Sequence, residues 1–285
     1  MKDFLKKLIS EHGLAHKLDQ LLAASTTGLR IVKQPSRNDV VGISRLGGLP
    51  DVSSGFEWPN RDGRSLGFLA QINCAETAAY DSENVLPSTG WLYFFYDVQE
   101  QPWGFDPMDR GSGVVLYSHA APIETAQPAD YSTKEAATPS IPIGFRSILS
   151  LPVWDSAARE SIGLGRSVAD NNAYYDLYDA FTKEASDEQT NHQLLGHSNN
   201  IQGDMQLECQ LVSHGLYCGD STGYEDRRVK ELEAGAGDWR LLLQFDSDDE
   251  LNVMWGDCGK LYFWIRGSDL AQHNFSRTWT ILQCG

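Results

Sequence analysis

The chain has 285 residues and a formal net charge of −16 at pH 7, from 39 acidic and 23 basic side chains. A chain of this length suits one large globular unit or two halves that share a core. Nucleic acids and anionic membrane surfaces need a basic binding surface, so the charge predicts no nucleic-acid partner and no membrane partner. The acidic surface either keeps the protein soluble or attracts a basic protein, and both interpretations stay open.

The cysteines and the N-terminus predict a cytoplasmic protein. The five cysteines have no CxxC spacing, and their odd number indicates reduced thiols (Cys74, Cys209, Cys218, Cys258 and Cys284). Neither Cys nor His clusters at the spacing of zinc ligands. Charged residues interrupt residues 1–18, which therefore lack the apolar core of a signal peptide. No apolar run is long enough to span a membrane.

Helices are predicted at the N-terminus and around the strands. Residues 2–23 carry one apolar stripe at helical spacing (Phe4, Leu5, Leu8, Ile9, Leu14, Leu18, Leu21 and Leu22). This amphipathic helix occupies most of an N-terminal segment 1–25 and is expected to pack on the domain, with Gly13 as a point where it can break. Further helices are expected over residues 173–184, 205–213 and 223–234.

Two stretches of the chain match each other, which indicates an internal duplication. Residues 68–73 (FLAQIN) align with residues 241–246 (LLLQFD), and residues 90–95 (GWLYFF) align with residues 259–264 (GKLYFW). Residues 46–48 (LGG) align with residues 194–196 (LLG). The apolar runs predict buried strands, so the expected class is α+β: an internally duplicated β-sheet core with an N-terminal amphipathic helix and peripheral helices. The related halves are expected at about residues 40–120 and 190–285.

Gln71 and Gln244 occupy the same place in the two matched strands. A buried amide needs hydrogen-bond partners, and the backbone commonly supplies them. The sequence therefore favours two glutamines that bind backbone at equivalent structural positions. A pocket with pseudo-symmetric glutamines is the alternative.

A series of short motifs resembles a known bacterial family. The motifs are residues 47–50 (GGLP), 57–59 (EWP), 68–73 (FLAQIN), 192–196 (HQLLG), 201–205 (IQGDM), 241–250 (LLLQFDSDDE), 255–257 (WGD) and 261–265 (LYFWI). In this order they resemble the YwqG-like family, a bacterial domain of unknown function, from about residue 40 to the C-terminus. The resemblance implies a soluble α+β fold with an internal duplication, so residues 1–285 are expected to form a single YwqG-like domain. It also implies an immunity role, suggested by relatives that occur near polymorphic toxins, and it supplies no agreed catalytic residues.

The turn that follows residues 241–246 holds the best candidates for a chemical site. Asp246, Asp248 and Glu250 alternate as the first oxygen ligands of a calcium loop do, which predicts a divalent-metal site. The comparison with an EF-hand then fails, because Leu251 stands where that loop needs glycine. If the preceding strand continued here, the three carboxylates would share one face and Asp249 would point the other way. A solvated turn is the simplest interpretation, with a cation or a basic partner as alternatives.

Three more candidates lie near this turn or in the loop 196–204. Trp255 and Asp257 follow the turn and would add an aromatic face and another carboxylate beside it. His197 is a candidate for general acid–base chemistry or ligand binding. No Ser or Cys is tied to His197 by a known motif, so no catalytic residue is assigned and enzymatic activity is left open.

Two functions of different classes fit these features. The favoured one is a non-catalytic protein-interaction or immunity-type module that binds a basic protein partner through its acidic surface. The alternative is a small-molecule or divalent-metal-binding protein, enzymes included, that uses the acidic turn 246–250 and the loop 196–204. No cofactor is predicted except a divalent cation in this alternative.

Overall fold

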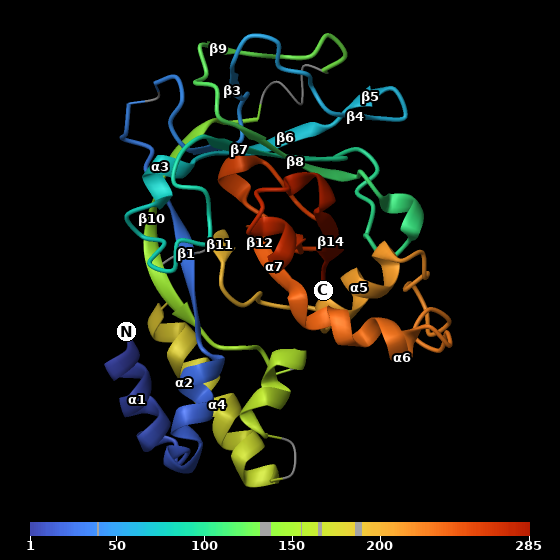
Figure 1. The fold of residues 1–285 in the computed structure, drawn as a ribbon. Helices are drawn as coiled ribbons and strands as arrows, with labels where there is room; N and C mark the ends of the chain where they lie inside the picture. Colours follow the sequence, from blue (N-terminus) through green and yellow to red (C-terminus); the bar gives the residue numbers. More distant parts are fainter. Residues whose placement is uncertain (39, 132–137, 155, 165–166, 186–189) are drawn as a thin grey trace.

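The computed structural model describes residues 1–285 except 39, 132–137, 155, 165–166 and 186–189. Ten of the described strands form one sheet in the order β14-β13-β12-β11-β1-β10-β2-β6-β7-β8, with antiparallel neighbours (Figure 1). They are β1 (Thr26–Lys33), β2 (Arg45–Leu46), β6 (Gly67–Asn73), β7 (Trp91–Tyr96), β8 (Gly113–Ser118), β10 (Ile141–Ser150), β11 (Gln193–Leu195), β12 (Trp239–Asp246), β13 (Lys260–Arg266) and β14 (Trp279–Gln283). Two short pairs lie apart from it: β3 (Asp51–Val52) with β9 (Glu124–Thr125), and β4 (Asn60–Arg61) with β5 (Arg64–Ser65). One large antiparallel sheet with surrounding helices confirms the α+β class.

The two ends of the sheet have the same strand order. β2, β6, β7 and β8 follow one another outward from β10, as β11, β12, β13 and β14 do from β1. The register shifts between Phe68 and Ala70 in β6 and between Leu241 and Leu243 in β12, which are matched positions in the sequence. β1 pairs with β10 along its whole length and joins the two ends. These two central strands lie outside the ranges 40–120 and 190–285, and a common origin of the halves stays a prediction.

The chain leaves β2 and β11 through the same backbone conformation. Gly47 and Gly48 have φ of 64° and 67°, and their counterparts Leu195 and Gly196 have φ of 56° and 75°. Two successive left-handed residues turn the chain sharply out of the sheet. A Cβ atom at Gly47 would lie 2.2 Å from the carbonyl oxygen of Pro139, so the first end requires glycine there.

The sheet curves so that the inner faces of its two ends contact each other. The rings of Phe94 in β7 and Phe263 in β13 have centroids 5.3 Å apart. Tyr96, also in β7, packs against Trp255 at 5.7 Å. The buried residues of this shared core come from both ends and from β1 and β10. One continuous core therefore fixes the relative positions of the loops at either end.

The N-terminal helices form a cluster with α4 beside the start of β1 and the end of β10, the two central strands (Figure 1). Their buried residues include Leu5, Ile9, Leu21 and Tyr174. The cluster is formed by α1 (Lys2–Glu11), α2 (Leu18–Ala24), η3 (Ala157–Ile162) and α4 (Val168–Ala185), and η1 (Ala15–Lys17) joins α1 to α2. The helix expected over residues 2–23 is thus two helices, because the chain turns at Gly13 with a φ of 75°.

The remaining helices are short. α5 (Gln206–Ser213) packs with the outer face of β12, β13 and β14. The helix expected over residues 223–234 is reduced to α6 (Val229–Leu232) and η4 (Glu233–Asp238). The others are α3 (Cys74–Thr77), η2 (Pro107–Asp109), η5 (Asp249–Leu251), α7 (Gly267–Leu270) and η6 (Phe275–Arg277). Within the described ranges, no helix has the length and apolar character needed to cross a membrane.

Candidate functional site

The loop 196–204 is fastened by side chains of the neighbouring strands. Gln193 Nε2 donates to the carbonyl of His197 at 2.8 Å, and Gln244 Oε1 accepts from the N–H of Asn199 at 2.9 Å. Two further contacts act in the same way, since Gln283 Oε1 accepts from the N–H groups of Ile201 and Gln202 at 2.9 and 3.1 Å. Backbone groups withdrawn from water need such partners, so the side-chain amides of Gln193, Gln244 and Gln283 hold the loop against the strands.

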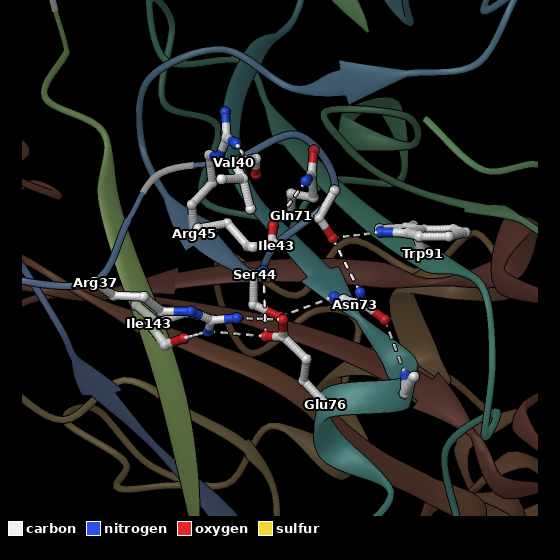
Figure 2. A network of polar contacts seen from close by, with 12 residues as sticks. Arg37, Val40, Ile43, Ser44, Arg45, Gln71, Asn73, Glu76, Trp91 and Ile143 are labelled. Atoms are coloured by element: carbon white, nitrogen blue, oxygen red, sulfur yellow. Dashed lines mark hydrogen bonds and ion pairs between the residues drawn. The ribbon is translucent and has the colours of Figure 1, made fainter. Parts of the chain in front are cut away.

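Gln71 and Gln244 make the same contacts at the two ends of the sheet. Gln71 Nε2 donates to the carbonyl of Ile43 at 2.8 Å (Figure 2). Gln71 Oε1 accepts from the N–H of Asp51 at 2.7 Å. Gln244 binds the N–H of Asn199 in the same way, and its Nε2 donates to the carbonyl of Asn191 at 2.7 Å. Both glutamines are fully buried. They bind backbone, as the favoured interpretation of the sequence predicts.

His197 connects the loop to the end of α2 and to β10. Its Nε2 donates to the carbonyl of Ala24 at 2.8 Å, and its backbone N–H donates to Ser150 Oγ at 2.9 Å. Burial lowers the pKa of His197, and the hydrogen bond to Ala24 opposes this shift only in part. The neutral ring therefore uses its one N–H to hold the backbone, and Nδ1 is the ring atom left for other contacts.

The acidic turn begins where β12 ends. β12 stops at Asp246, whose Oδ2 accepts from the N–H of Asn191 at 2.8 Å. Asp248 then caps η5 by accepting from the N–H of Glu250 at 2.9 Å. The three alternating carboxylates do not share a strand face, because the backbone leaves the extended conformation after Asp246.

Asp248 is the buried centre of this turn. Its Oδ2 accepts from Lys33 Nζ at 2.6 Å and from His192 Nε2 at 2.9 Å. His192 Nδ1 accepts from the N–H of Asp246 at 3.1 Å, so the hydrogen of the neutral ring is on Nε2, facing the carboxylate. Burial raises the pKa of Asp248, but the bonds from His192 and Lys33 outweigh it and hold the pKa well below its usual range. Asp248 is therefore ionised and compensated inside the protein.

The outer acids of the turn face solvent. Asp249, Glu250 and Asp257 are exposed, and within the described part of the chain only Glu250 among them has an ion pair, to Lys33 at 3.3 Å. Trp255 is 1% exposed and packs among aromatic rings of the core. The aromatic face expected beside the turn is thus buried, and the surface here is acidic.

A cavity of about 530 Å³ opens at the turn. Its lining consists of the turn and of side chains from β1 and the neighbouring loops (Lys33, Thr190, Asp246, Ser247, Asp248, Asp249, Glu250, Met254 and Cys258). The loop 196–204 lines other cavities, of about 350 and 390 Å³. Asn191 and Gln244 link the two loops by hydrogen bonds, but the loops open to different cavities.

A family model described as a domain of unknown function (DUF1963) matches residues 44–284. The chain belongs to this family. A comparison with curated proteins gives no match. In this DUF1963 protein, the residues that match the family model include both ends of the sheet, the acidic turn and the loop 196–204. Lys33 precedes the matched residues.

Sequence reasoning missed the two residues that compensate Asp248 in this DUF1963 protein. His192 begins the HQLLG motif and Lys33 ends the first strand, so neither is near the turn in sequence. The sequence offered one signal for His192, namely its place just before residues 194–196 (LLG), which match residues 46–48 (LGG) of the other half. Among the residues that the structure describes, no three His, Cys, Asp or Glu side chains are arranged to hold a metal ion. The Lys33 ammonium supplies the positive charge between Asp248 and Glu250.

Proposed function

We propose that this protein is a non-catalytic interaction module of the immunity type, which binds a basic protein partner through the acidic turn. The proposal rests on the contrast between one buried, paired carboxylate of the turn and two exposed carboxylates near it. Asp248 is buried and compensated by Lys33, so it serves the fold. Asp249 and Asp257 are exposed and have no ion pair among the described residues, so they are available to a partner.

Three further features support the proposal. Met254 is 53% exposed and lines the same cavity as the acids, so it offers apolar contact to the stem of a lysine or arginine. The net charge of −16 would steer a basic partner toward the protein and repel acidic ones. The resemblance of the sequence motifs to the YwqG-like family supports the immunity-type role.

Affinity capture from native lysate tests the proposal. The wild type is compared with a triple variant of the turn, Asp249→Asn, Glu250→Gln and Asp257→Asn. We expect a basic protein that the wild type retains at low salt and releases at high salt, because exposed charge pairs are screened by ions. The turn variant should lose this protein.

A matched control separates the location of the charge from its total. Asp19→Asn, Asp176→Asn and Glu225→Gln remove the same number of exposed charges elsewhere. This control should keep the partner. Equal loss from both variants, or no salt-sensitive partner of the wild type, contradicts the proposal.

A second candidate is a small-molecule or divalent-metal-binding protein, enzymes included, that uses the acidic turn 246–250 and the loop 196–204. The cavity of about 530 Å³ beside the carboxylates supports it. Thermal-shift measurements with divalent ions and nucleotides test it, with Asp249→Asn/Glu250→Gln as the variant. A response of the wild type that the variant lacks would favour this candidate, and a flat response of both proteins would rule against it.

A further inference from the structure

A cleft lies between α4 and the loop 196–204, and it shares no lining residue with the cavity at the acidic turn. It is made of two cavities of about 390 Å³ each, and the two share lining residues (Tyr178, Asp179, Thr182, Asn191 and Asn199). Each volume lies in the roughly 300–1,000 Å³ range of small-molecule sites. No residue of the turn 246–250 lines either cavity, so the cleft is separate from the proposed partner surface.

One wall of the cleft is aromatic and accessible. Trp154 is 40% exposed and Tyr175 is 56% exposed, and both line the same one of the two cavities. The guanidinium carbon of Arg159 lies 4.0 Å from the centroid of the Trp154 ring, which covers one ring face and holds it by a cation–π contact. Tyr174 OH donates to the carbonyl of Pro152, which fastens α4 to the segment that carries Trp154. The rings are therefore presented on a fixed frame.

The other wall offers amide donors. Asn191 Oδ1 accepts from Arg30 Nη1, and Asn199 Oδ1 accepts from Gln244 Nε2 at 3.1 Å. Because both amide oxygens are used inside the protein, the NH₂ groups are the ends that remain for other contacts. Asn199 Nδ2 donates to Tyr178 OH at 3.2 Å, and Tyr178 itself lines the cleft.

An acceptor stands on the α4 side of the same cleft. The Asp179 side chain is exposed, and no described residue forms an ion pair with its carboxylate. The cleft thus combines accessible aromatic rings, amide donors and one carboxylate acceptor. A ligand that fits must have an apolar face together with groups that both donate and accept hydrogen bonds.

We propose that this cleft binds a neutral saccharide, a role that does not rest on the interaction with a basic protein. The C–H face of a sugar ring packs against Trp154 or Tyr175, and its hydroxyl groups bond to Asp179 and to the Asn191 amide. Hydroxyl groups suit this lining because each one donates and accepts. Asp179 lines both cavities, whereas the cations Arg30 and Lys183 line only one of them. Together with the net charge of −16, this disfavours phosphorylated ligands.

Isothermal titration calorimetry of the full chain with neutral mono- and disaccharides tests the proposal. At least one should bind with a dissociation constant in the millimolar range, and added salt should leave the affinity unchanged because the ligand is uncharged. Trp154→Ala and Asp179→Asn should each weaken binding about tenfold. Trp103→Ala is the matched control, because Trp103 is 38% exposed and lies outside the cleft lining, and it should bind as the wild type does.

Several outcomes would overturn the saccharide site. They are no binding of any neutral saccharide, binding that neither variant weakens, and a preference for nucleoside monophosphates over sugars. Thermal unfolding of each variant checks the fold, and Tyr175→Ala replaces Trp154→Ala should the latter lower the unfolding temperature. The triple variant of the turn (Asp249→Asn, Glu250→Gln and Asp257→Asn) must still bind the saccharide, which distinguishes this result from the loss of the protein partner.

Discussion

The two ends of the sheet hold their outer loops with the same geometry but with different charges. At the first end, Arg45 Nη2 bonds to Asp51 Oδ2 at 2.6 Å, and Arg45 Nη1 donates to the carbonyl of Leu49 at 3.2 Å. At the second end, the uncharged Gln193 stands in the place of Arg45 and donates to the carbonyl of His197 at 2.8 Å. The strand register is equivalent, since Arg45 pairs with Gln71 and Gln193 pairs with Gln244.

This comparison distinguishes the glutamine–backbone contacts, which both ends need, from the Arg45–Asp51 ion pair, which only the first end has. At both ends a buried glutamine binds one N–H that follows the short strand (β2 or β11) and one carbonyl that precedes it, and this need is set by the backbone. The buried pair Arg45–Asp51 is a local addition, because Gln193 and Asn199 fill the same positions without charge. A buried ion pair contributes little over a neutral replacement, but it is costly to break on one side.

The largest effect should come from breaking that ion pair on one side. Arg45→Gln leaves the Asp51 carboxylate, 1% exposed, without its cation. We expect a loss of about 3–5 kcal/mol in the free energy of unfolding, the usual cost of an uncompensated buried charge. Urea denaturation of the variant and the wild type measures it.

The double variant Arg45→Gln/Asp51→Asn is the control, because it copies the residue types of the second end. It should recover most of the lost stability. A double variant no more stable than Arg45→Gln would mean that the two ends are not equivalent.

A smaller loss should follow removal of either glutamine. Gln71→Leu and Gln244→Leu each leave one buried N–H and one buried carbonyl without a partner, at a cost of about 2–4 kcal/mol. Because the contacts match, the two losses should agree within about 1 kcal/mol. Chemical denaturation of both variants provides the comparison, and a large loss at one end alone would show that the equivalence is limited to geometry.

At the ends of β6 and β12, the backbone N–H groups are bound by side chains in the same way. The N–H of Asn73 donates to Ser44 Oγ at 2.9 Å, as the N–H of Asp246 donates to His192 Nδ1 at 3.1 Å (Figure 2 shows the first end). The first end forms the ion pair Arg37–Glu76 at 2.5 Å with the chain just after β1. The second end forms ion pairs with Lys33 of β1, from Asp248 at 2.6 Å and from Glu250 at 3.3 Å. The second end differs in placing its carboxylate beside a histidine ring.

Sequence reasoning reached the parts of this molecule that are encoded locally. The matched strands and the two glutamines were readable, because apolar runs and buried amides leave a pattern within a few residues. The central pairing of β1 with β10 was not, since it joins segments more than a hundred residues apart with no shared motif. The partners of Asp248 escaped for the same reason, as did the burial of Trp255, which depends on rings from both ends of the sheet.

The smallest effect concerns Asp248 and depends on pH. Its folded-state pKa is held below the unfolded value, which is near 3.9. The stabilisation from its ionised form is therefore complete at neutral pH and is lost as the pH falls below about 4 through the folded-state pKa. Asp248→Asn should cost about 1–2 kcal/mol at neutral pH, because the variant keeps the size of the side chain but loses its charged contacts.

The difference between Asp248→Asn and the wild type should shrink steadily in acid, as measured by urea denaturation over a series of pH values. Asp249→Asn is the control, since this neighbouring acid is exposed and has no ion pair within the described residues. It should change stability by no more than about 0.5 kcal/mol at any pH. If the loss of stability in Asp248→Asn stays constant with pH, then the shape of the Asp248 side chain, and not its charge, stabilises the turn.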